Sequence, residues 1–74
     1  MQSSPTQTID VVVNGKIQTV PESLTLLELL NFLSIEPARV AIELNRSIIR
    51  RREWGAVRIE ENAQLEIVQF VGGG

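Results

Sequence analysis

The dipeptide Asn14-Gly15 stands between two short runs rich in β-branched residues, in the segment IDVVVNGKIQTV. Asn and Gly both tolerate a positive φ, which the two central residues of a tight hairpin turn require. The sequence therefore predicts two antiparallel strands, one on each side of this dipeptide. Pro21 is expected to end the second strand. Any fold proposed for the chain has to accommodate this hairpin.

A helix is predicted directly after the hairpin, in the segment SLTLLELLNFL. Thr25, followed three residues later by Glu28, forms a capping-box pattern that would start the helix. The ring of Pro37 disfavours the α conformation at the preceding residue, so the helix should end before it. The apolar residues recur with the spacing of one helix face, which we assign to Leu26, Leu27, Leu30 and Leu33.

Two later segments, VAIELN and LEIVQF, alternate in the way that is typical of a strand with one buried side. In the first segment the buried side consists of Val40, Ile42 and Leu44. In the second, the buried side holds Leu65 and Ile67, and the opposite side holds Glu66, Val68 and Phe70. In the irregular stretch between these segments, Ile48 and Ile49 are candidates for a short strand and Trp54 for a packing anchor.

The order hairpin, helix, strand, irregular stretch, strand indicates an α+β fold in which one main helix packs on a small mixed sheet. We expect the ubiquitin-like, or β-grasp, arrangement, in which the last strand pairs beside the first. The predicted organisation is a disordered leader over residues 1–8, a β-grasp domain over 9–71 and a flexible glycine tail over 72–74.

The composition of the chain limits the classes of function that it can have. The chain has 74 residues, a net charge of −2, and neither Cys nor His. It offers no basic field for nucleic acid or anionic membranes, and it lacks the commonest catalytic nucleophile and base. We therefore expect no metal site, no nucleic-acid partner and no membrane partner. The first residues, MQSSPTQT, lack the features of a signal peptide, so the expected location is cytoplasmic.

Several of these elements together resemble the sulfur carrier protein of thiamine biosynthesis, the ThiS family. They are the Val13-Asn14-Gly15 turn, the helix start TLLELL, the strand AIELN, the Arg52-Glu53-Trp54 element and the end QFVGGG. The resemblance runs from about Val11 to Gly74 and leaves out the leader. The small subunit of molybdopterin synthase is similar in fold and also ends in Gly-Gly. The Arg-Glu-Trp element favours the thiamine carrier, and the molybdopterin branch stays open.

The resemblance implies a protein co-substrate rather than an enzyme. In this family a ThiF-type adenylating enzyme activates the C-terminal glycine carboxylate, here that of Gly74, and a sulfur donor system converts it to a thiocarboxylate. The sulfur then passes to a thiazole synthase of the ThiG type. No cofactor is bound, and the activating enzyme consumes ATP. Gly72 and Gly73 would let the tail thread a narrow channel, because glycine has no side chain.

The outward side of the last strand is the predicted docking surface for these partners. If Leu65 and Ile67 face the helix, Val68 and Phe70 point away from it, next to Val71 and the tail. The alternative is that Phe70 folds onto a neighbouring loop.

Two other classes of function remain open on the sequence alone. A ubiquitin-like modifier would form an isopeptide bond with a target lysine through the same activated terminus. A simple interaction module would bind through its sheet and would not use the tail. The run Arg50-Arg51-Arg52 is expected to be solvated, because short charge runs in loops usually are.

Overall fold

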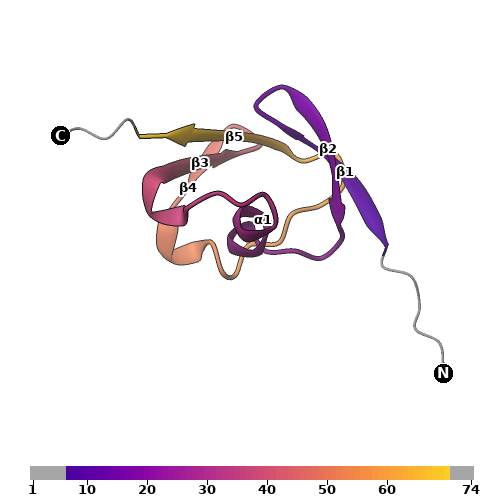
Figure 1. The fold of residues 1–74 in the computed structure, drawn as a ribbon, viewed down its shortest axis with the longest axis horizontal. Coiled ribbons are helices and arrows are strands. Elements are labelled where there is room, and N and C mark those ends of the chain that lie inside the picture. The colour runs from indigo at the N-terminus through magenta and orange to yellow at the C-terminus, as the bar shows by residue number, and fades with distance from the viewer. Residues whose placement is uncertain (1–6, 71–74) are drawn as a thin grey trace.

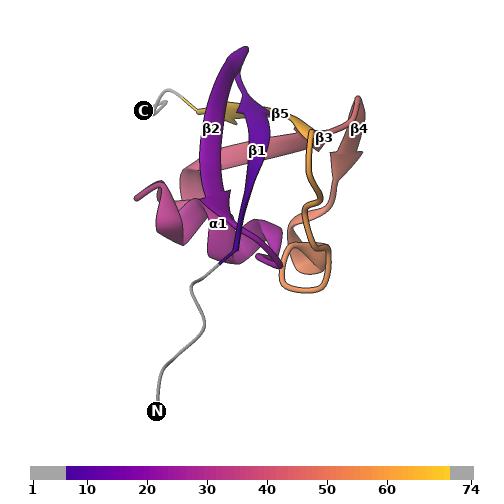
Figure 2. The ribbon, with the colours of Figure 1, turned by 90° about the vertical axis from the view of Figure 1, so that its right-hand side faces the viewer.

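The computed structural model describes residues 7–70. Its elements are β1 (Thr8–Val13), β2 (Lys16–Pro21), α1 (Leu26–Phe32), the 3₁₀ helix η1 (Pro37–Arg39), β3 (Val40–Leu44), β4 (Ser47–Ile49), the 3₁₀ helix η2 (Arg51–Glu53) and β5 (Gln64–Gln69). The strands form one sheet in the order β2-β1-β5-β3-β4. The sheet curves around α1, which lies against one of its faces (Figures 1 and 2).

The predicted hairpin is confirmed. Asn14 and Gly15 have φ values of 51° and 82°, and they join β1 to β2 in an antiparallel register that pairs Val13 with Lys16. Pro21 is the last residue of β2. Strand β1 begins at Thr8, one residue before the expected start of order, and the Gln7 carbonyl accepts a 3.0 Å hydrogen bond from the amide of Glu22.

The helix begins at the predicted capping box. The Thr25 hydroxyl accepts a hydrogen bond from the Glu28 amide at 3.1 Å, and the Glu28 carboxylate accepts one from the Thr25 amide at 2.9 Å. It ends at Phe32, well before Pro37, and Ser34, the residue after the C-cap Leu33, has a φ of +61°. There the Ser34 amide donates to the Asn31 carbonyl and the Ile35 amide donates to the Leu30 carbonyl. This pair of bonds is a Schellman motif, which satisfies carbonyls of the last helical turn.

The predicted buried face of the helix was wrong at one position. Leu27 is 44% exposed, whereas Leu29, which the sequence analysis left out, is fully buried together with Leu26 and Leu30. Leu33 is partly buried against the same core. The helix therefore presents to the sheet a face centred between Leu29 and Leu30, and Leu27 lies on the side that faces solvent.

The strand predictions agree with the observed packing. Val40, Ile42, Leu65 and Ile67 are all buried in the core with the helix leucines. Ile48 and Ile49 lie in the short strand β4. At the centre of the sheet, β5 runs parallel to β1 on one side and antiparallel to β3 on the other. The predicted α+β arrangement, with the last strand beside the first, is confirmed.

The irregular stretch after β4 packs against the core through Trp54. Trp54 is 2% exposed, and its indole Nε1 donates a 2.9 Å hydrogen bond to the carbonyl of Ile49, so its anchoring role is confirmed. The residues of the arginine run are exposed, as expected, but Arg51 also makes contacts that the sequence analysis did not predict. Its guanidinium donates to the carbonyls of Pro37 and Val40 and lies 4.9 Å from the centre of the Trp54 ring. Arg51 thus ties η2 to the start of β3.

Candidate functional site

The last strand, β5, is held in place by a side chain from the first hairpin. The Oδ1 atom of Asn14 accepts a 2.7 Å hydrogen bond from the Ile67 amide, and its Nδ2 atom donates a 3.1 Å bond to the Ile67 carbonyl. The amides of Val12 and Asn14 also donate to the carbonyls of Ala63 and Leu65. The Asn14 side chain therefore continues the β1–β5 ladder by one position, beyond the point where the backbone turns away into the hairpin.

The other side of β5 is paired with β3 almost to the end of the described chain. The register runs from Leu44 opposite Leu65 to Val40 opposite Gln69, and the Phe70 amide then donates to the Arg39 carbonyl at 2.7 Å. The backbone is thus fixed on the β3 side through Phe70. The other predicted site residues, Val71, Gly72, Gly73 and Gly74, lie outside the described residues.

The sheet face opposite α1 carries exposed apolar side chains next to the end of β5. Val68 is 57% exposed and Phe70 is 52% exposed, as the alternation along β5 predicts. Ile48, on β4, is 77% exposed. We call this region the outer patch; it consists of Ala41, Ile48, Val68 and Phe70. Between its strands lies a shallow hollow of about 290 Å³, lined in part by Ala41, Ile48 and Val68.

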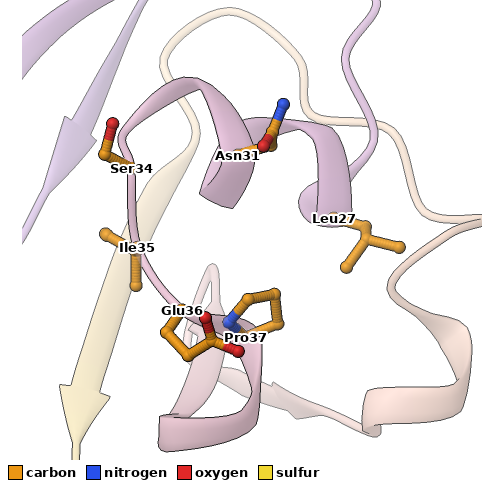
Figure 3. Close-up of a pocket in the computed structure, with 6 residues that line it drawn as sticks. All are labelled: Leu27, Asn31, Ser34, Ile35, Glu36 and Pro37. Atoms are coloured by element: carbon orange, nitrogen blue, oxygen red, sulfur yellow. The ribbon is translucent and has the colours of Figure 1, made fainter.

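A larger hollow lies elsewhere, between α1 and η1. It has a volume of about 490 Å³. Figure 3 shows its six lining residues: Leu27, Asn31, Ser34, Ile35, Glu36 and Pro37. Only one of these, Glu36, carries a charge, and the hollow is an open depression between the helix and the following turn. It therefore offers no set of converging catalytic groups.

Within residues 7–70, no group of three or more Asp and Glu side chains is placed to hold a metal ion. In the same range, no helix is long and apolar enough to cross a membrane. The candidate functional site is the outer patch at the end of β5, the part of the predicted site that the structure describes.

A five-stranded mixed sheet that curves around one helix, with the final strand between the first and third strands, defines the ubiquitin-like β-grasp class. Within this class the chain belongs to the ThiS family, whose model matches residues 6–74. The family resemblance predicted from the sequence is confirmed. It supports a role as a sulfur carrier in thiamine biosynthesis.

A solved structure agrees with this assignment, and an uncharacterised protein is similar over most of its length. The crystal structure of the thiamine biosynthesis protein ThiS from Geobacter metallireducens matches with a TM-score of 0.79 and 35% identity, over 89% of this chain and 100% of that one. An uncharacterised protein of Porphyra purpurea, ycf40, is 35% identical over 66 residues, which cover 89% of this chain and 93% of that protein.

A second kind of relative is much longer than this chain. The thiazole synthase of Magnetococcus marinus is 39% identical over 62 residues, which make up 84% of this chain but 19% of that protein. The matched region is 20% of the thiazole synthase of Paramagnetospirillum magneticum. This chain therefore spans about a fifth of the length of these two relatives.

Proposed function

We propose that this protein carries sulfur for thiazole formation in thiamine biosynthesis, as a thiocarboxylate on the main chain at Gly74. It is then a co-substrate of other enzymes and not itself a catalyst. The observation that carries the proposal is the family match, which extends through Gly74, on a chain whose fold agrees with that of a ThiS protein. The absence of Cys from the sequence is compatible with this chemistry, because the sulfur is carried by the terminal carboxyl group.

The proposed chemistry follows from the low reactivity of a carboxylate. A terminal carboxyl group has a pKa of about 3.5 and is ionised at neutral pH, where it is a poor acyl electrophile. In the first step a carboxylate oxygen of Gly74 attacks the α-phosphorus of ATP, and pyrophosphate leaves. In the second step a sulfide equivalent attacks the acyl carbon, and AMP leaves. The product is the thiocarboxylate. Since the reaction consumes ATP, we place it in the cytoplasm.

The proposed partners are a ThiF-type adenylating enzyme, a sulfur donor system and a thiazole synthase of the ThiG type. The thiazole synthase is supported by the two long relatives, in which a region similar to this chain belongs to a protein named thiazole synthase. Domains that are joined in one protein commonly work together when they are separate. The tail residues Gly72 and Gly73 would pass through a narrow channel of each partner, because they have no side chains.

The test is intact-mass spectrometry with fragmentation of the C-terminus. The protein is incubated with ATP, a ThiF-type enzyme and a sulfur source, beside a variant that lacks Gly74. Exchange of one oxygen for sulfur adds about 16 mass units, which oxidation of Met1 also adds, so fragmentation has to locate the change. The proposal requires an ATP-dependent change on Gly74. An unmodified terminus in the presence of a competent enzyme would contradict it.

The sequence offers an independent chemical readout of the same product. The chain has no Cys, so a thiol-directed alkylating reagent should label the protein only after the thiocarboxylate has formed. Oxidised Met1 does not react in this way. Labelling should be absent without ATP and absent in the variant that lacks Gly74.

We also propose that Val68, Phe70 and Val71 dock the partner enzymes. Phe70→Ala should raise the KM for adenylation without lowering the melting temperature, because the side chain is 52% exposed and Phe70 directly precedes Val71 and the tail in the sequence. Phe32→Ala is a matched control, since Phe32 is 51% exposed but lies at the end of α1. Equal adenylation kinetics in both variants and the wild type would refute a docking role for Phe70.

A further inference from the structure

Two carboxylates stand opposite each other on the outer face of the sheet. In the register of β3 and β5, Glu43 is the direct partner of Glu66. Residues in this relation have Cβ atoms roughly 5 Å apart. Both side chains point away from α1, because their neighbours Ile42, Leu65 and Ile67 are buried against the helix. This pair of like charges is therefore a feature of the functional face and not of the core.

Apolar side chains of the outer patch flank this pair on two sides. Ile48 is the cross-strand neighbour of Glu43 on β4, and Ala41 and Val68 form the next pair along β3 and β5. All five side chains, with Ile42, line the hollow of about 290 Å³. Among these described lining residues there are two acidic side chains and no basic one. The lining of the hollow thus combines apolar side chains with two carboxylates and no cation.

Such a pair is unfavourable in the free protein. Like charges directly opposite on neighbouring strands destabilise a sheet, whereas an opposite charge between them would stabilise it. An arginine meets both requirements of this hollow. Its planar guanidinium can donate to two carboxylates at once, and its flat faces and aliphatic stem pack well on apolar side chains.

We propose that Glu43 and Glu66 together bind the guanidinium of one arginine of the partner enzyme that docks on the outer patch. This inference rests on the proposed function, because it specifies the chemistry of the partner surface that holds the carrier. The surface that fits presents an arginine flanked by apolar residues, and these contact Ile48 and Val68. The patch includes Phe70, which directly precedes Val71 and the glycines in the sequence, so the arginine would hold the sheet while the tail is engaged.

The test measures affinity and stability in the same variants. We use Glu43→Gln and Glu66→Gln, with Glu61→Gln as the control, because Glu61 is an exposed carboxylate in a turn away from the patch. Binding to the ThiF-type adenylating enzyme is measured by titration calorimetry at low and high salt. Each patch variant should bind roughly tenfold more weakly, since a charged hydrogen-bond partner is lost, and its affinity should depend less on salt. The control should match the wild type.

Stability should change in the opposite direction. Loss of either charge relieves the repulsion across the strands, so each patch variant should melt about 2 to 4 °C higher than the wild type. A residue with a merely structural role would lower stability and affinity together, and that result would overturn the inference. As a further check, Glu66→Arg should abolish binding, and an arginine-to-glutamate change in the partner surface should restore it.

The outcomes separate this inference from the proposed function. If the wild type is loaded with sulfur while both patch variants bind within twofold of it, only the arginine site is refuted. If the wild type neither binds the adenylating enzyme nor acquires an alkylatable terminus, both proposals are refuted.

Discussion

The side chain of Asn14 should contribute more to stability than a turn residue usually does. It makes two hydrogen bonds to the backbone of Ile67, at 2.7 and 3.1 Å. Each such bond has a net value of about 0.5–1.5 kcal/mol. Asn14→Gly keeps the positive φ of 51° accessible but removes both bonds, so it should destabilise the protein by about 1–3 kcal/mol. Asn14→Ala should cost about 1 kcal/mol more, because alanine disfavours that conformation.

Two further variants separate the effect of backbone strain in the turn from the effect of the Asn14 hydrogen bonds. Gly15 has a φ of +82°, and a Cβ atom added there would meet no other atom within 4 Å. Gly15→Ala therefore reports backbone strain alone, which we expect to be about 1 kcal/mol. Asn14→Asp keeps the acceptor for the Ile67 amide but places a second oxygen against the Ile67 carbonyl. The free energy of unfolding of Asn14→Asp should lie between those of the wild type and Asn14→Gly.

The assay is urea denaturation of all four variants, combined with amide hydrogen exchange. In Asn14→Gly the amide of Ile67 should lose protection more than the amide of Val68, because residues of β5 point their amides alternately toward β1 and β3. If Asn14→Gly unfolds within 0.5 kcal/mol of the wild type and the Ile67 amide keeps its protection, the side chain does not hold β5, and the reasoning is refuted.

Four other variants test the helix and the Trp54 anchor. Leu29→Ala should lower the free energy of unfolding by about 2–5 kcal/mol, because Leu29 is fully buried. Leu27→Ala should lower it by less than about 1 kcal/mol. Urea denaturation compares the two variants directly. Ser34→Gly should raise the free energy of unfolding by about 0.5–1 kcal/mol in the same assay. The reason is that Ser34 has a φ of +61° at the end of α1, a conformation that glycine adopts more readily. Trp54→Phe should lose at least about 1 kcal/mol in thermal melts, because the Ile49 carbonyl loses its indole donor, and an unchanged melting temperature would contradict this.

The helix shows how far the sequence pattern determines the packing. At about 100° per residue, the set Leu26, Leu29, Leu30 and Leu33 spans about 100° of the helix surface. The set with Leu27 in place of Leu29 spans about 120°. Both sets satisfy an amphipathic pattern, because leucine occupies all five positions. The structure selects the narrower stripe, since it fits against the sheet and leaves Leu27 at the surface. Periodicity alone predicted the helix and its cap but could not choose between these faces.

The contacts that fix the candidate site depend on which strands are neighbours in the sheet. Short sequence patterns do not predict which strands are neighbours. Asn14 was interpreted only as a turn former, since its partner Ile67 is 53 positions away along the chain. Arg51 was interpreted as a solvated charge, because its carbonyl acceptors lie on η1 and β3, in another part of the sequence. By contrast, the exposure of Val68 and Phe70 followed from the alternation of β5, since a strand has only two faces.

The two faces of β5 link the stability of the protein to its proposed function, because one face packs in the core and the other faces the partner. Leu65 and Ile67 complete the core, while Glu66 and Val68, which alternate with them, line the hollow on the outer face of the sheet. A shift of β5 by one residue would exchange these faces, burying a carboxylate and moving the apolar core residues into solvent. The bonds from Asn14 and from β3 fix the register against such a shift. They consequently also fix which side chains the partner meets, although Asn14 itself lies outside the patch.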